Sequence, residues 1–363
     1  MINSSDLQGV YPWTASPLIV SAPMAKIAMP KLAVAVSKAG GLGFIAAGYH
    51  SDNLEDLLEE AKDHLFDDEE TTQTERNSPQ PVFLPVGVGF ITWSASLVDA
   101  LPAFKKYWPC AVWLFAPPVG FQDLVPWATQ IRNITSHKTQ IWVQVGTVAD
   151  AIEVTRVVKP DVIVAQGSDA GGHSLARGAS IVSLVPEICD KLHEIWTPAQ
   201  GQISVLAAGG ISDGRGVAAA INLGAQGCVM GTRFLASPES MIATGYQKEV
   251  LRASDGGVST TRTKIYDSVR GIDGWPDRYD GRGVINQTYV DACDGLCDVK
   301  NRELYRESLN KWDEGYGPEG RLCTYAGTAV GLVKRVMSAG SIVTSTREEA
   351  NRLLYRVRHA TKL

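Results

Sequence analysis

Residues 161–177 read DVIVAQGSDAGGHSLAR and combine an apolar run, a pair of glycines and a single histidine. The apolar run 161–165 is typical of a parallel strand that is covered on both faces, and the glycines after it indicate a sharp turn at the strand end. In α/β enzymes such strand ends bring the backbone close to a bound cofactor and direct one side chain at it. Here that side chain is His173, which can accept or release a proton near neutral pH. We therefore predict that His173 is a catalytic base.

Seven similar apolar runs alternate with Ala-rich or amphipathic segments, which is typical of repeated βα units. Strands are expected at 17–23, 42–48, 82–90, 111–117, 140–146, 161–167, 203–209 and 227–232. Capping residues, prolines and glycines place helices at 30–39, 147–158 and 213–223, and the amphipathic pattern predicts a last helix at 346–358. Eight such units in about 220 residues match an α/β fold of the (β/α)8 TIM barrel type. The alternative is an open doubly wound sheet, which has fewer strands and a Gly-rich phosphate turn after the first strand.

Two segments interrupt the repeat. Residues 66–81 are acidic and polar, which indicates an exposed and partly disordered loop. Residues 251–325 are rich in Gly and Asp and too long for a single loop, so we expect a small subdomain or lid after the eighth strand. The predicted division is therefore a barrel over 1–250, a lid over 251–325, and C-terminal helices over 326–363 that pack back on the barrel.

The composition excludes several classes of partner. With 39 acidic and 34 basic residues the formal net charge is −5, which disfavours nucleic acid and anionic membranes. No apolar run approaches the roughly 20 residues of a membrane span, and the N-terminus lacks the pattern of a signal peptide. Six cysteines without a CxxC pair indicate reduced thiols and a cytoplasmic location. The C-terminal Thr361-Lys362-Leu363 resembles a peroxisomal address, with an ordinary basic tail as the alternative.

Glycines follow the last two predicted strands. Gly209 and Gly210 end the seventh strand, and Gly231 and Thr232 end the eighth. In this fold the loops after these strands form a recurrent phosphate site, because backbone N–H groups and helix N-termini converge there. We therefore predict a phosphate-bearing ligand at this place.

The other strand ends are neutral and small, which suits a flat aromatic cofactor. Gln144 and Gln166 are placed to hydrogen-bond the edge of such a ring, although either could equally face water. Few carboxylates occur at strand ends, so we predict no metal site. A single histidine beside a phosphate-bearing cofactor favours proton abstraction coupled to redox chemistry over hydrolysis.

Taken in order, these motifs resemble the nitronate monooxygenase family, formerly called 2-nitropropane dioxygenases, which are FMN enzymes on a TIM barrel. The resemblance covers residues 17–343. It rests on Ala22-Pro-Met-Ala25, Gln166 through His173, Ala207-Ala-Gly-Gly-Ile211, Met230-Gly-Thr-Arg-Phe234 and Tyr325-Ala-Gly-Thr-Ala-Val-Gly331. The chain departs from many members at Gly87-Val-Gly-Phe90, where they have Asn, and at Ser174-Leu-Ala-Arg177, where they have Arg-Gly.

The resemblance implies a role for each matching position. His173 would take the α-proton of a neutral nitroalkane or orient the nitronate anion, and electrons would pass through the flavin to O2 to give a carbonyl compound and nitrite. The partners would be this small substrate and O2. The positions implied to contact the cofactor are Ala22, Pro23 and Met24 along the flavin, Gln144 and Gln166 near its ring or ribityl chain, Gly171 in close approach, and Gly209, Gly210, Gly231 and Thr232 at the phosphate.

Two other functions stay open at this point. The same scaffold resembles NAD(P)H-dependent quinone and enoyl reductases, so a nicotinamide-driven flavin reductase or a tailoring oxidoreductase is the main alternative. A flavin-binding barrel without turnover is the other, and an intact His173 speaks against it. The sequence predicts neither the physiological substrate nor the oligomeric state.

Overall fold

Eight parallel strands close into a barrel in the computed structural model, which describes residues 5–66, 81–195 and 202–360. The last of them, β9, returns to pair with β1, and this closure confirms the predicted TIM barrel over the open sheet. The barrel strands are β1 Leu18–Ser21, β2 Leu42–Gly48, β3 Val82–Ile91, β4 Tyr107–Phe115, β5 Gln140–Val145, β6 Val162–Gln166, β8 Ser204–Ala208 and β9 Gly227–Met230.

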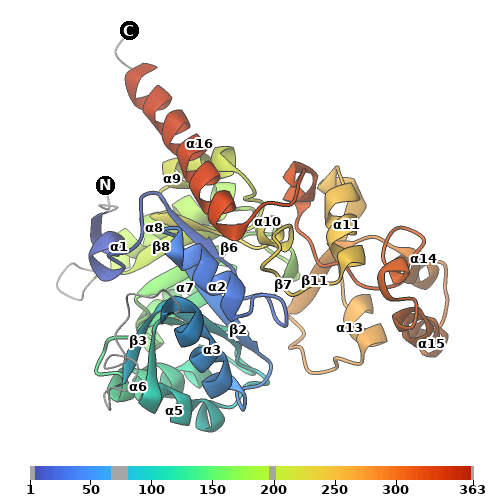
Figure 1. Ribbon diagram of the computed structural model, residues 1–363, viewed down its shortest axis with the longest axis horizontal. Helices are drawn as coiled ribbons and strands as arrows, with labels where there is room; N and C mark the ends of the chain where they lie inside the picture. The colour runs from blue at the N-terminus through green and yellow to red at the C-terminus, as the bar shows by residue number, and fades with distance from the viewer. Residues whose placement is uncertain (1–4, 67–80, 196–201, 361–363) are drawn as a thin grey trace.

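Helices follow the strands and cover the outside of the barrel (Figure 1). Two of them begin where the sequence predicted, because Thr147 accepts a hydrogen bond from the N–H of Asp150, and Asp213 accepts one from the N–H of Arg215. The helices of this layer are α2 Pro30–Lys38, α3 Leu54–Phe66, α5 Leu97–Lys106, α6 Val125–Ile134, α7 Val148–Val157, α8 Ile181–Ile195, α9 Gly214–Asn222 and α10 Thr232–Leu235.

Aromatic side chains fill the barrel interior. Phe44, Trp113 and Trp142 pack on one another there, and Trp142 donates a hydrogen bond from Nε1 to the hydroxyl of Tyr11, 2.8 Å away. Gly87 belongs to this packing, since a Cβ on it would lie 2.3 Å from the ring of Phe44. Side chains therefore fill the barrel interior around these rings, and open space begins only toward the C-terminal ends of the strands.

A second, three-stranded sheet lies beside the barrel, on the right in Figure 1. Its strands are antiparallel and run in the order β10 Thr260–Thr263, β11 Tyr279–Val284 and β7 Gly172–Leu175. The sequence pattern predicts no strand at 172–175, after the sixth barrel strand. A strand forms there because β11, distant in sequence, supplies its partner, with Gly281 opposite His173.

The rest of the segment after β9 is mostly helical. Tyr246 and Val250 of α11 pack against Val284 and Val330, so α11 joins the added segment to the barrel. The predicted boundary between 250 and 251 falls within α11, and the division into domains stays a prediction. These elements are α11 Thr244–Arg252, α12 Gly256–Ser259, α13 Ile265–Arg270, α14 Gln287–Cys293, α15 Asp298–Leu309, η3 Trp312–Gly315 and η4 Thr328–Leu332.

The chain begins and ends with helices outside the repeat. The short α1, Ser5–Val10, precedes β1, and the long α16, Ala339–Ala360, packs against α9 and α2. The predicted last helix began at 346, so α16 starts earlier than expected. No helix among the described residues is long and apolar enough to cross a membrane. Most of the predicted loop at 66–81, together with Thr361-Lys362-Leu363, lies outside the described residues.

Candidate active site

A cavity of about 680 Å³ opens at the C-terminal ends of the barrel strands. All eleven residues that the sequence singled out line it, although they come from six separate parts of the chain. They are Ala22, Pro23, Met24, Gln144, Gln166, Gly171, His173, Gly209, Gly210, Gly231 and Thr232.

One end of the cavity is built from the turns after β8 and β9. Gly209 and Gly210 have φ angles of +105° and +75°, a backbone conformation that favours glycine. A Cβ at Gly231 would make ordinary van der Waals contact with Ala22 and Met24, at 3.7 Å, so the fold leaves room for a side chain there. The Ser212 hydroxyl, also on the cavity wall, is buried and has no hydrogen-bond partner among the described residues. A buried donor without a partner is costly, so this end of the cavity suits an anion such as phosphate.

Thr232 and Gly171 are tied to a later segment of the chain. The hydroxyl of Thr232 accepts a hydrogen bond from the N–H of Gly327, at 2.9 Å. A Cβ on Gly171 would lie 2.4 Å from the nitrogen of Gly327 and 2.5 Å from the carbonyl carbon of Ala326. The close packing of residues 326–327 is therefore a structural reason for glycine at 171, independent of any ligand.

The two glutamines form a directional chain of hydrogen bonds. Trp113 donates from Nε1 to Oε1 of Gln144 at 3.1 Å, so the Gln144 amide must present Nε2 to Oε1 of Gln166, which lies 2.5 Å away. Gln166 in turn donates from Nε2 to the carbonyl of His173 at 3.4 Å. Each amide nitrogen keeps a second hydrogen, which can be offered to the acceptor edge of a ring.

Pro23 forms part of the cavity wall. A Cβ on Gly89 would lie 2.4 Å from the Cβ of Pro23, so glycine at 89 leaves room for the Pro23 ring against β3. Ala22 is held by a backbone hydrogen bond from its N–H to the carbonyl of Met230, at 3.0 Å. This wall presents apolar surface and backbone, as a flat ring requires.

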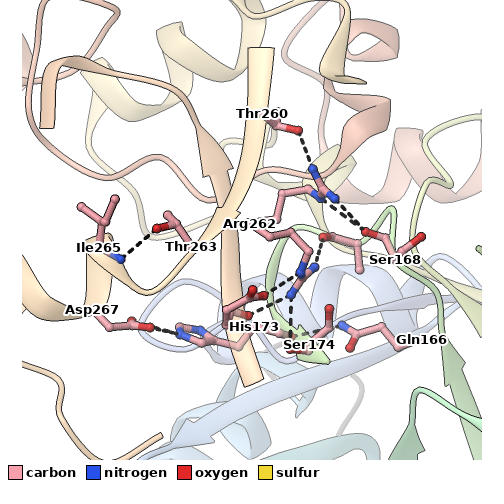
Figure 2. Close-up of polar contacts among 12 residues, drawn as sticks. Gln166, Ser168, His173, Ser174, Thr260, Arg262, Thr263, Ile265 and Asp267 are labelled. Atoms are coloured by element: carbon pink, nitrogen blue, oxygen red, sulfur yellow. Dashed lines mark hydrogen bonds and ion pairs between the residues drawn. The ribbon is translucent and has the colours of Figure 1, made fainter. Parts of the chain in front are cut away.

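His173 is held on three sides. Its Nε2 lies 3.0 Å and 2.9 Å from the two carboxylate oxygens of Asp267 (Figure 2), and the two side chains are only 9% and 6% exposed. The indole of Trp275 stacks on the imidazole, with ring centroids 3.9 Å apart and planes 6° apart. The ring of Tyr325 lies 5.3 Å away on another side. The imidazole is therefore fixed in one orientation on the cavity wall.

Tyr325 and Arg270 continue the network beyond Asp267. The Tyr325 hydroxyl donates to Oδ1 of Asp267 at 3.1 Å, and Nη1 of Arg270 donates to that hydroxyl at 3.2 Å. Burial holds the pKa of Tyr325 well above its ordinary value, so the phenol stays protonated and remains a donor. The Arg270 guanidinium lines the cavity and forms no ion pair with a carboxylate of the described residues, which leaves a positive charge on the wall.

The sequence patterns predict no role for Asp267, Arg270 or Trp275. They include Tyr325 only as the first residue of a family motif. The first three lie within 251–325, where no spacing relates them to His173, and Asp267 is 94 residues away from it. The pairing of β7 with β11 brings them together. No signal in a single sequence marks that pairing.

Comparison with known proteins identifies a single family. A family model described as nitronate monooxygenase matches residues 12–66 and 120–302. A protein named nitronate monooxygenase npaC, from Metarhizium robertsii, is 46% identical over 94% of this chain and 93% of its own length. A nitronate monooxygenase from Neurospora crassa is 38% identical over 97% of this chain and 93% of its own length.

Two solved structures share the fold. A nitroalkane oxidase from Streptomyces ansochromogenes aligns with a TM-score of 0.70 at 21% identity, covering 97% of this chain and 99% of its own. FabK from Thermotoga maritima aligns with a TM-score of 0.69 at 24% identity, covering 99% of both chains. At this level of identity the likeness concerns the architecture alone.

Proposed function

The chain belongs to the nitronate monooxygenase family, and on this basis we propose that it is an FMN-dependent oxidoreductase that converts alkyl nitronates or nitroalkanes and O2 to carbonyl compounds and nitrite. The observation that carries the proposal is the position of His173. It lines a cavity whose far end is suited to phosphate, and a buried carboxylate holds its ring.

The residues of the cavity fit FMN. Gly209, Gly210 and Gly231, with the unpartnered hydroxyl of Ser212, would hold its phosphate. Gln144 and Gln166 would offer N–H groups to the ring, and the wall of Ala22, Pro23 and Met24 would pack along it. When bound, the flavin supplies the electron transfer between the substrate and O2.

The protein's own groups account for the rest of the chemistry. His173 removes the α-proton of a neutral nitroalkane, or orients a nitronate that arrives already deprotonated. The Arg270 cation on the wall favours binding of the nitronate anion over the neutral form. Phe115 and Trp93 add apolar surface to the same cavity and exclude water from the reacting carbon.

A spectrum and two assays test the function. The purified protein should show flavin absorption, consume O2 with a pre-formed alkyl nitronate, and release nitrite. If NADPH bleaches the flavin without O2 while nitronates cause no O2 uptake, the chain is a nicotinamide-driven reductase and the proposal is wrong.

The base role predicts a specific result for His173→Asn. This variant should keep its flavin but lose about 10²- to 10⁴-fold in kcat/KM for a neutral nitroalkane, the usual contribution of a general base. The measurement is O2 uptake over a substrate series, with flavin content checked by absorption. Unchanged turnover of the neutral nitroalkane would show that another group takes the proton.

We propose a cytoplasmic location, with a peroxisomal one as the alternative that Thr361-Lys362-Leu363 raises. Fluorescent fusions that keep the tripeptide at the free C-terminus, or lack it, distinguish the two. A diffuse signal from both fusions removes the peroxisomal alternative.

A further inference from the structure

We propose that Asp267 is a positioning residue that keeps the proton of His173 on Nε2, so that Nδ1 is the nitrogen that accepts the substrate proton. The inference rests on the proposed function, since it specifies how the base of that reaction is set. Asp267 acts through His173 and not on the substrate.

The geometry at Nε2 assigns the tautomer. A carboxylate only accepts hydrogen bonds, so a nitrogen within 2.9–3.0 Å of both its oxygens must carry a hydrogen. Neutral imidazole has one N–H, and the other nitrogen is then the basic one. Nδ1 has no hydrogen-bond partner among the residues that the structure describes, and His173 lines the cavity.

Trp275 prevents the ring from exchanging its two nitrogens. A stacked indole at 3.9 Å permits the imidazole to slide in its plane but opposes rotation out of it. A ring flip would also break both contacts to Asp267. The stacking and the carboxylate thus support the same orientation.

Asp267 is itself held in place by a hydrogen bond. Tyr325 donates to its Oδ1, and Arg270 reaches that phenol. Burial raises the pKa of both Tyr49 and Cys323 to about 12 and that of Tyr325 well above its ordinary value. Near neutral pH these three groups are therefore uncharged, and the other ionisable side chains on the cavity wall include Lys26, Arg270 and Asp273.

Proton transfer then follows without further rearrangement. The Cα–H bond of the nitroalkane breaks, its electron pair stays with the nitronate, and the proton forms a bond to Nδ1. The imidazolium that results keeps its Nε2–H on the carboxylate of Asp267, so the new positive charge is paired at once. The face of Trp275 also favours a cation.

The tautomer can be measured directly. Protein labelled with ¹⁵N-histidine, at a pH where imidazole is neutral, should give a protonated Nε2 signal and an unprotonated Nδ1 signal for His173. The His173→Asn variant identifies these signals among the six histidines. A protonated Nδ1 in the unmodified protein would overturn the inference, whatever the activity.

Kinetics test the consequence. Asp267→Asn should lower kcat/KM for a neutral nitroalkane by about 10²-fold. The introduced amide can hydrogen-bond either tautomer of His173, so Nδ1 would no longer be kept free of a proton. Oxidation of the pre-formed nitronate, which needs no base, should change less than about threefold. Asp267→Glu, which keeps a carboxylate, should restore part of the loss.

Asp150→Asn is the matched control. It removes a buried carboxylate that pairs with Arg278 of the same added segment, at 2.7 Å, and does not contact His173. It should leave the ratio of nitroalkane to nitronate activity unchanged. An Asp267→Asn protein with the unmodified ratio contradicts the inference, whereas an unmodified protein inactive on both substrates contradicts the proposed function instead.

Discussion

At the scale of the residue, different physical constraints explain why glycine occurs at different positions on the cavity wall. Gly171 is required by packing, since the backbone of residues 326–327 occupies the place of its side chain. Gly231 has no such neighbour, and its φ of −106° is open to any residue. Packing therefore explains the glycine at 171, whereas the predicted phosphate contact is the reason we propose for the glycine at 231.

This difference predicts opposite results for two matched variants. Gly171→Ala should lower the free energy of unfolding by about 1–3 kcal/mol, because a backbone segment must move. Gly231→Ala should unfold like the parent protein but bind FMN about tenfold more weakly, as its methyl group takes space from the phosphate. Urea unfolding and flavin titration measure the two effects, and equal losses of stability would contradict the assignment.

At the scale of the element, α9 begins directly after the Gly209-Gly210 turn, and its cap carries a charge. Burial alone would raise the pKa of the Asp213 carboxyl, but hydrogen bonds from Arg215 and the N–H of Gly216 outweigh it and hold the pKa below its ordinary value. The folded state thus releases this proton more readily than the unfolded chain. The carboxylate stabilises the fold above its unfolded pKa, and this stabilisation disappears as pH falls through the folded pKa.

Asp213→Asn should therefore show a stability deficit that depends on pH. The variant keeps a capping side chain but loses the charge, so we expect a deficit of about 0.5 kcal/mol near neutral pH, discounted because the carboxylate is 21% exposed. The difference should vanish in acid below the folded pKa. Unfolding curves across this pH range measure it, and a constant difference would argue against the charge as its cause.

At the scale of the whole molecule, Arg262 is one of three arginines that hold the added sheet against the barrel, together with Arg278 and Arg282. Arg262 of β10 donates from Nε to Asp280 on β11 at 2.6 Å (Figure 2 shows its position), and from its Nη atoms to the carbonyls of Ser174 and Ala170 after β6. The ion-paired side chains are 10% and 13% exposed. The same contacts hold the strand that carries His173.

Arg262→Ala should consequently cost both stability and activity. Removing one partner of a buried pair leaves Asp280 uncompensated, which typically costs about 3–5 kcal/mol. Because β7 loses its support, nitroalkane turnover should fall even where the variant remains folded. Arg215→Ala, which removes an exposed ion pair with Asp213, is the control and should lose at most about 0.5 kcal/mol of stability while keeping the parent activity. Similar losses in both variants would contradict the role of Arg262 in holding the added sheet against the barrel.

Local sequence patterns are enough to predict the barrel and the face on which the cavity opens. Apolar runs and strand-end glycines are local signals, and parallel strands of a closed barrel all end on one face, so Pro23, Gln166, Gly210 and Gly231 had to meet. Their contacts with a flavin stay a prediction.

Only the tertiary structure decided what surrounds His173. The strand β7 exists because β11 pairs with it, and that pairing brings Asp267 to Nε2 and Trp275 onto the ring from a segment without local signals. Hydrogen-bond direction and ring stacking depend on positions in space that sequence distance does not encode. The sequence therefore predicts that His173 is the base, and only the fold places the Asp267 carboxylate at its Nε2.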